Sequence, residues 1–149
     1  MESSWLSGAE WIALLRIAVG LWWLESFRHK DKRAWIERGA GISWARSVAE
    51  KHRWPFVRDA FERSVTPRPK LMTYVVLGGE LAAGLGLAVG FLTPIAAAGG
   101  LLLNVLYFVL MIHDWAEQGQ NSMMAAAQIV ILGAHGWQAW SVDHMLGIF

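Results

Sequence analysis

The sequence predicts an all-α protein: a bundle of four transmembrane helices joined by one long cytoplasmic loop that carries short interfacial helices. The first observation behind this is composition, since the 149 residues are 55% hydrophobic and only 17% charged, with a mean hydropathy of +0.34. A soluble domain carries about 25% charged residues. A chain of this length has room for one domain, and we expect residues 1–149 to form a single integral membrane domain.

The second observation is that four apolar stretches approach the roughly 20 residues that cross a bilayer core. They cover residues 11–27, 71–92, 94–113 and 122–140. Thr93 is expected to cap the third helix, with Pro94 at its first position, which closes a tight hairpin. Asn121 or Ser122 is expected to cap the fourth. The N-terminal segment MESSWLSGAEW lacks a basic region, so the first stretch is expected to remain as a transmembrane helix.

The third observation is the distribution of charge. Residues 28–70 contain 12 of the 13 lysines and arginines, and only Arg16 lies elsewhere. The positive-inside rule places this loop in the cytoplasm and both termini on the opposite side of the inner (plasma) membrane. Residues 41–52 and 53–63 predict short helices, which either lie in the membrane interface or form a soluble helical hairpin.

Three polar residues interrupt the apolar stretches, and each calls for a partner or a task because polar groups are costly in a membrane. Counting 1.5 Å per residue, we expect Arg16, Glu80 and Asn104 to lie within about one turn of a common depth. Arg16 and Glu80 are then expected to form a buried ion pair, supported by Asn104. This layer either fixes helix register or forms a site for a quinone headgroup or for protons.

Further polar residues are secondary candidates for the same site: Asn121, Gln128 and His135, the last two seven residues apart on one side of the fourth helix. Small residues recur at intervals of three or four and serve either internal packing or docking of a partner subunit: Gly79, Ala83, Gly86, Gly90, Ala96, Gly100. Tryptophans near the ends of the stretches predict an interfacial belt, although one or two could stack on a pigment or quinone: Trp5, Trp11, Trp22, Trp23, Trp115, Trp137, Trp140.

Several kinds of site find no support in the residues. The chain has no cysteine, so thiolate metal sites and cysteine nucleophiles are excluded. No two histidines are expected to face each other at one depth in the membrane, which argues against haem. We expect no metal, no firmly bound cofactor and no nucleic-acid partner.

The run GGELAAGLGLAVGFLTPIAAAGGLLLNVLYFVL resembles the second and third helices of the DoxX-like family, which includes the small DoxD subunit of thiosulfate:quinone oxidoreductase. LLRIAVGLWWLESFRHK, WPFVRDAFERSVTP and WSVDHML extend the resemblance over residues 14–146. It implies a four-helix membrane bundle bound to redox partners, with Arg16, Glu80, Asn104 and Asn121 at the family's polar positions.

Two functions are therefore expected. The first is an integral membrane subunit of a quinone-linked redox complex, catalytic only within that complex. The second is a non-catalytic structural or assembly subunit of a larger respiratory or photosynthetic membrane complex. A small transporter is less favoured, because no repeat with broken helices is evident.

Overall fold

The computed structural model describes residues 5–149, and the first four residues of the N-terminal segment lie outside it. Within the described part all regular secondary structure is helical, and there are no β-strands. The eight helices are α1 (Gly8–His29), α2 (Lys32–Arg38), α3 (Ala40–Glu50), α4 (Pro55–Ser64), α5 (Pro69–Val89), α6 (Thr93–Leu110), α7 (Trp115–Gly133) and α8 (Val142–Leu146).

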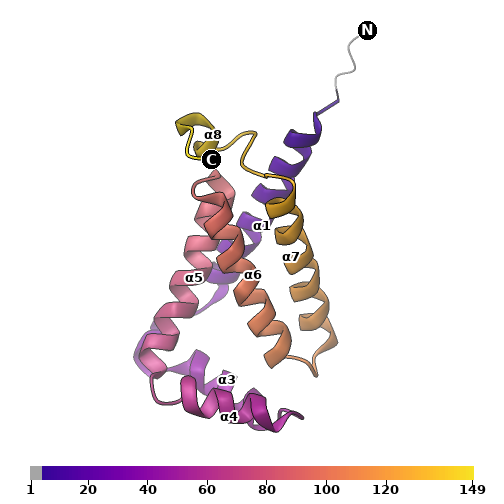
Figure 1. Ribbon diagram of the computed structural model, residues 1–149. Coiled ribbons are helices and arrows are strands. Elements are labelled where there is room, and N and C mark those ends of the chain that lie inside the picture. The colour runs from indigo at the N-terminus through magenta and orange to yellow at the C-terminus, as the bar shows by residue number, and fades with distance from the viewer. Residues whose placement is uncertain (1–4) are drawn as a thin grey trace.

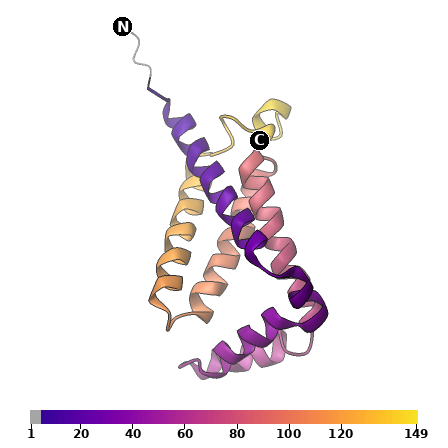
Figure 2. The same cartoon turned by 180° about the vertical axis from the view of Figure 1, so that it is seen from behind.

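The four long helices α1, α5, α6 and α7 pack side by side as a bundle (Figures 1 and 2). α1 packs on α5 and α7, and α6 packs on α5 and α7, so the four helices close around one interior. Two of them, α5 and α6, are long and apolar enough to cross a membrane, with mean hydropathies of 1.6 and 1.8. α1 and α7, of 22 and 19 residues, have the length for it as well.

The interior of the bundle is filled by apolar side chains from all four long helices: Val19, Trp23, Ala83, Leu87, Ala97, Leu103, Ile131. Small residues let the backbones approach closely. A Cβ added to Gly20 would collide with the backbone of Gly84 and Ala88, and one added to Gly86 would collide with Ala96. Gly84, Gly86 and Gly100 are therefore internal contacts between helices.

The fourth long helix begins and ends seven residues earlier than predicted. α7 starts at Trp115, where the Asp114 carboxylate accepts from the backbone N–H groups of Ala116 and Glu117. The expectation that Asn121 or Ser122 caps this helix is therefore wrong, because an aspartate about two turns before them already supplies the cap. At the start of α6 the cap residue is Leu92, in the left-handed conformation (φ 50°), and not Thr93.

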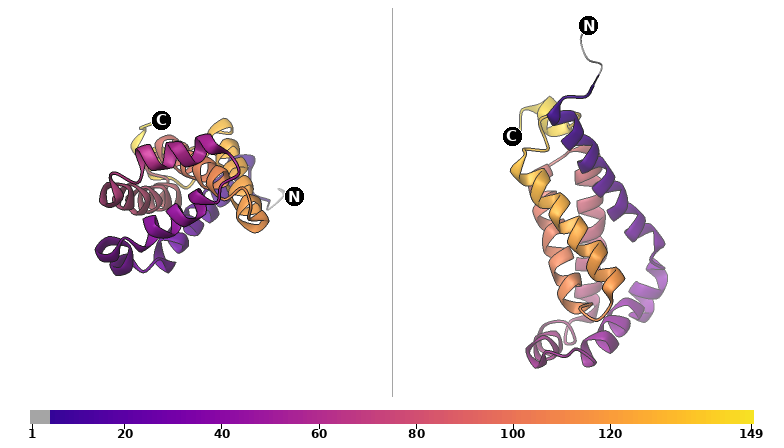
Figure 3. Two further views of the ribbon diagram at one scale, coloured as in Figure 1. Left: turned by 90° about the horizontal axis from the view of Figure 1, so that it is seen from below. Right: turned by 90° about the vertical axis from the view of Figure 1, so that its right-hand side faces the viewer.

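The basic loop forms three short helices, α2, α3 and α4, where two were expected. α3 and α4 lie across one end of the bundle, roughly perpendicular to its axis (Figure 3). Ile42, Ala49 and Phe61 are their buried apolar residues, whereas Trp44 and Phe56 are 49% and 65% exposed. The buried His52 holds this layer in place, because its Nε2 lies 2.9 Å from the carbonyl oxygen of Val109 in α6.

The opposite end of the bundle carries the start of α1, the α5–α6 turn and the C-terminal helix α8 (Figure 1). Asp143 of α8 is fully buried, and its carboxylate accepts from the backbone N–H groups of Leu92 and Thr93, both at 2.7 Å. Its own N–H donates to the carbonyl oxygen of Gly90 at 2.9 Å. The C-terminal segment is thus fastened to the turn between α5 and α6.

Candidate functional site

A fully buried carboxylate, Glu80 in the middle of α5, is the centre of the polar interior. The ammonium group of Lys30 lies 2.8 and 2.7 Å from its two oxygens. The hydroxyl group of Tyr107 donates to Oε1 at 2.7 Å, and Ser26 Oγ lies 3.5 Å from the same oxygen. Each carboxylate oxygen thus has at least one charged or hydroxyl partner, as a buried charge requires.

Three helices place these groups. Ser26 and Lys30 lie one turn apart at the end of α1, and the ammonium group also donates to Ser26 Oγ at 2.9 Å. Tyr107 comes from α6. In this cluster of Glu80, Lys30 and Tyr107, 19% of the Lys30 side chain is exposed, at the end of the bundle covered by α2–α4, whereas the Glu80 side chain is fully buried. The cluster therefore links a buried carboxylate to the edge of the bundle.

Arg16 lies at the other end of the bundle and does not pair with Glu80, so the expected ion pair is wrong. Its Nη2 donates to the carbonyl oxygen of Trp140 at 2.6 Å. Within residues 5–149, its Nε and Nη1 have no hydrogen-bond partner although the side chain is fully buried. The guanidinium group lies against Gly90, whose positive φ of 69° and missing Cβ make room for it.

The register of α1 against α5 explains why the pair does not form. Gly20 lies beside Gly84 and Ala88, in the last two turns of α5, although it is twelve residues into α1. α1 therefore extends beyond the end of α5 by roughly 12 Å. Ser26, which contacts Glu80, is ten residues after Arg16, so the two charges are about 15 Å apart along the axis of α1.

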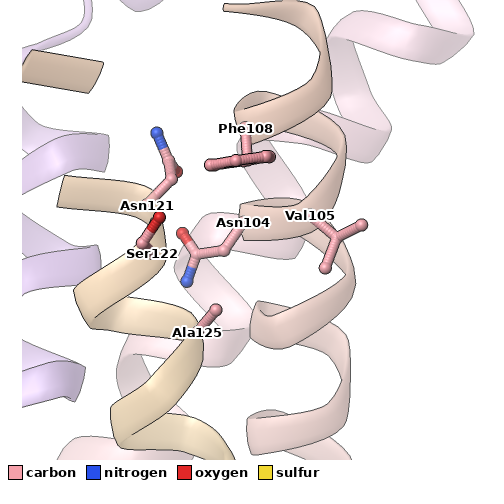
Figure 4. A pocket seen from close by; sticks show the side chains of 6 residues that line it. All are labelled: Asn104, Val105, Phe108, Asn121, Ser122 and Ala125. Carbon is pink, nitrogen blue, oxygen red and sulfur yellow. The ribbon is translucent and has the colours of Figure 1, made fainter. Parts of the chain in front are cut away.

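Two other predicted residues, Asn104 and Asn121, come together between α6 and α7. Both are 2% exposed, and they line a cavity of about 220 Å³ together with Val105, Phe108, Ser122 and Ala125 (Figure 4). Asn121 Nδ2 donates to the carbonyl oxygen of Glu117 at 2.7 Å. Asn104 Nδ2 is buried without a hydrogen-bond partner in the described chain.

Gln128, the third amide, lies deeper in the bundle. Its Nε2 donates to the carbonyl oxygen of Met124, whereas its Oε1 is buried and has no partner among residues 5–149. The Oε1 atom and the Nε1 of Trp23 both lie beside Gly100, whose hypothetical Cβ would collide with both of them. Only a glycine leaves room for these two groups, one turn from Asn104 on α6.

The structure corrects the expected positions of His135 and Trp23. His135 is exposed, follows the end of α7 with a φ of 53°, and packs edge-on against Trp137, so it does not share a helix side with Gln128. Trp23 is 2% exposed in the core and is no part of an interfacial belt. Trp5, Trp11, Trp22, Trp115 and Trp140 are exposed, as a belt requires.

Lys30 and Tyr107 were missed by sequence reasoning, yet a signal for Tyr107 was present. Gly100, Asn104 and Tyr107 follow one another at helical spacing, so they share one side of α6. Nothing in the sequence indicated that Lys30 belongs to the site, because it lies at the end of α1 and was assigned to the loop of residues 28–70. Its long side chain reaches inward to Glu80.

The family model DoxX matches residues 11–114 of the chain, which is more than half of its length. The chain belongs to the DoxX family. The resemblance seen in the sequence is confirmed over α1–α6, and DoxX proteins are membrane proteins generally associated with redox functions. Searches of curated proteins and of solved structures give no match to this DoxX chain.

The DoxX match includes every member of the Glu80 cluster as well as Arg16 and Asn104. α7 and α8 lie beyond it, with Asn121, Gln128 and Asp143. The segment that the family model matches thus supplies three of the four long helices and the buried carboxylate of Glu80. α7 is the fourth long helix and lines one side of the cavity between α6 and α7.

Proposed function

We propose that this DoxX protein crosses the inner membrane four times, through α1, α5, α6 and α7, and works as the membrane subunit of a quinone-linked redox complex. The observation that carries this proposal is the fully buried Glu80 in contact with both Lys30 and Tyr107. An ionisable residue at membrane depth indicates a proton or ligand site by default. Reduction of a quinone consumes protons, and a carboxylate held between an ammonium and a hydroxyl group can take up and release them.

The residues present fit a quinone as substrate. Its ring oxygens accept hydrogen bonds, and the buried Nδ2 of Asn104 is a donor without a partner within the described residues. When bound, the quinone supplies the redox chemistry, with electrons from a partner redox subunit. Glu80, Lys30 and Tyr107 hold the protons in this proposal.

The proposed topology places α2–α4 on the cytoplasmic side and both termini opposite. It is supported by the 12 lysines and arginines of residues 28–70 and by the position of α3 and α4 across one end of the bundle (Figure 3). The natural chain has no cysteine, so Glu62→Cys and Gln138→Cys each provide a unique thiol. A membrane-impermeant maleimide added to intact cells is expected to label the second variant and not the first.

Glu80→Gln tests the redox role. This substitution keeps the shape and the hydrogen bond from Tyr107 but removes the negative charge that handles protons. We expect quinone-linked electron transfer in membranes to fall at least about tenfold, a loss typical of a removed general acid or base, with the amount of assembled complex unchanged. The matched control is Glu117→Gln, a carboxylate outside the interior. Normal electron transfer in Glu80→Gln would contradict the proposal.

A specific observation favours a structural or assembly subunit as a second candidate. Gly78 and Gly99 lie on exposed faces of α5 and α6, and no atom lies within 4 Å of a Cβ added to either of them. Glycines on outer faces of membrane helices allow a second helix to approach closely. In this case Gly78→Leu and Gly99→Leu would release partner subunits on gentle solubilisation, whereas Glu80→Gln would leave activity unchanged.

A further inference from the structure

The cavity between α6 and α7 is a second candidate site for the proposed function, in addition to the Glu80 cluster. It measures about 220 Å³ and is separate from the Glu80 cluster, since none of that cluster's residues lines it. Figure 4 shows the amide of Asn104 directed toward α7, where Ala125 and Ser122 lie, whereas Val105 points away from α7 at the outer side of α6. We propose that this cavity is the docking place of the quinone headgroup, with the Asn104 amide as its anchor.

The orphaned amide is the first argument. Asn104 is 2% exposed, and its Nδ2 has no acceptor within the described chain. A buried donor without an acceptor is energetically unfavourable, so an acceptor from a ligand offsets that cost on binding. A ring carbonyl oxygen is such an acceptor. The neighbouring Asn121 uses one N–H of its Nδ2 for the carbonyl oxygen of Glu117, so Asn104 is the amide whose nitrogen has no partner within the described chain.

The shape and polarity of the lining agree with a planar headgroup. Phe108 forms one wall with an aromatic ring, and Val105 and Ala125 are apolar. The polar groups of Asn104, Asn121 and Ser122 gather in the same cavity. Apolar walls with a few fixed polar groups are the usual construction of a small-molecule site.

The cavity reaches the outer surface of the bundle. Val105 is 47% exposed and Phe108 36%, and both belong to the outward side of α6. In a bilayer this surface faces lipid, so a quinone would enter sideways and leave its isoprenoid tail among the acyl chains. This entry rests on the proposed function, which places α6 and α7 in the membrane.

The position on α6 connects the cavity with the proton-holding groups. Asn104 and Tyr107 are three residues apart and therefore neighbours on one helix side. Tyr107 contacts the carboxylate of Glu80 at 2.7 Å. A headgroup held by Asn104 would thus bind within one turn of α6 of the residue whose hydroxyl group reaches Glu80.

Binding of decylubiquinone to the purified full chain in lipid nanodiscs tests the assignment without electron transfer. Quenching of tryptophan fluorescence gives the dissociation constant. Ala125→Phe fills the cavity, and the matched control Ala126→Phe adds the same ring at the neighbouring exposed position. We expect Ala125→Phe to weaken binding at least about tenfold, which corresponds to about 1.4 kcal/mol, and Ala126→Phe to leave it unchanged.

Asn104→Leu provides a second variant if the added ring disturbs folding. It removes the anchoring amide at similar volume and is also expected to weaken binding by about tenfold. Decane, which has the tail but no ring oxygens, should not compete. Unchanged binding in both Ala125→Phe and Asn104→Leu, equal weakening by Ala126→Phe, or full competition by decane would overturn the assignment.

The two proposals fail separately. If Ala125→Phe binds the quinone normally while Glu80→Gln still abolishes electron transfer, the cavity is not the site and the redox function stands. If Ala125→Phe loses binding while electron transfer in membranes continues at the normal rate, the cavity binds quinone but the redox function is wrong.

Discussion

The two ends of the bundle both bury charge, but they neutralise it in different ways. At the end with α8, Arg16 donates to a backbone carbonyl and Asp143 accepts from two backbone N–H groups. At the end with α2–α4, Glu80 is held by side chains, an ammonium group and a phenol. Backbone carbonyl and N–H groups do not serve as acids or bases near neutral pH, whereas ammonium and phenol groups are titratable. The comparison separates an end whose charges bind the backbone from the end at which we propose the proton chemistry.

Asp143→Ala should produce the largest effect, because it breaks the structural end. It leaves the N–H groups of Leu92 and Thr93 without an acceptor and removes the negative charge nearest to the buried Arg16. We expect the free energy of unfolding to fall by about 3 kcal/mol. Unfolding in mixed micelles with rising SDS fraction measures it.

Asp143→Asn is the control for that substitution. The asparagine oxygen still accepts one backbone hydrogen bond, so the loss should be distinctly smaller than in Asp143→Ala. Equal losses in the two variants would mean that charge, and not capping of the α5–α6 turn, dominates at this end.

Lys30→Met should have the next largest effect. It leaves Glu80 buried with Tyr107 and the distant Ser26 as partners, and because Lys30 is partly exposed we expect a loss of about 2 kcal/mol. The double variant Lys30→Met/Glu80→Met removes both charges and should recover most of this stability. The same SDS titration checks both variants.

Failure of the double variant to recover would show that the ion pair stabilises the bundle by itself. Recovery of stability with loss of electron transfer would show the opposite. In that case the ion pair of Lys30 and Glu80 does not stabilise the fold and serves the proposed proton chemistry. The charges at the end with α8 would then differ from it by stabilising the fold.

Tyr107→Phe should have a moderate effect, because it deletes only the hydroxyl that donates to Glu80. A hydrogen bond to a charged group contributes about 1.5 kcal/mol, and the ring remains in place against Trp23. Unfolding in SDS measures the loss. An unchanged free energy of unfolding would indicate that the Tyr107 hydroxyl does not hold the carboxylate.

Asp114→Ala should have the smallest effect, since it lies outside the bundle interior. It removes the cap of α7 and should cost about 1 kcal/mol. Asp114→Ser keeps a capping oxygen and should retain most of the stability. A loss as large as that of Asp143→Ala would mean that the start of α7 carries tertiary contacts beyond its cap.

The sequence predicted the helices well and their mutual arrangement poorly. Apolar stretches and their lengths found all four long helices, because burial of apolar surface follows directly from residue type. The largest boundary error was at α7, where about two mostly polar turns after Asp114 were excluded from the apolar stretch. In the basic loop, the sequence predicted two short helices, which correspond to α3 and α4, and missed the third, α2.

The ion pair between Arg16 and Glu80 was beyond sequence reasoning for a definite physical reason. Depth was counted from the start of each helix, which assumes that the helices begin level with one another. The contact of Gly20 with Gly84 and Ala88 sets a different register, and such contacts are long-range. Asn104 and Asn121 could be expected to meet, because a short connection joins α6 and α7 as antiparallel neighbours.

The contact between Arg16 and Trp140 joins residues 124 positions apart. During synthesis the guanidinium of the first helix is made when its acceptor is still more than a hundred codons away. The Arg16 side chain in α1 therefore lacks this hydrogen-bond acceptor until nearly the whole polypeptide has left the ribosome. This end of the molecule is the last to close, and a nascent chain that stalls after α6 would expose Arg16 to cellular quality control.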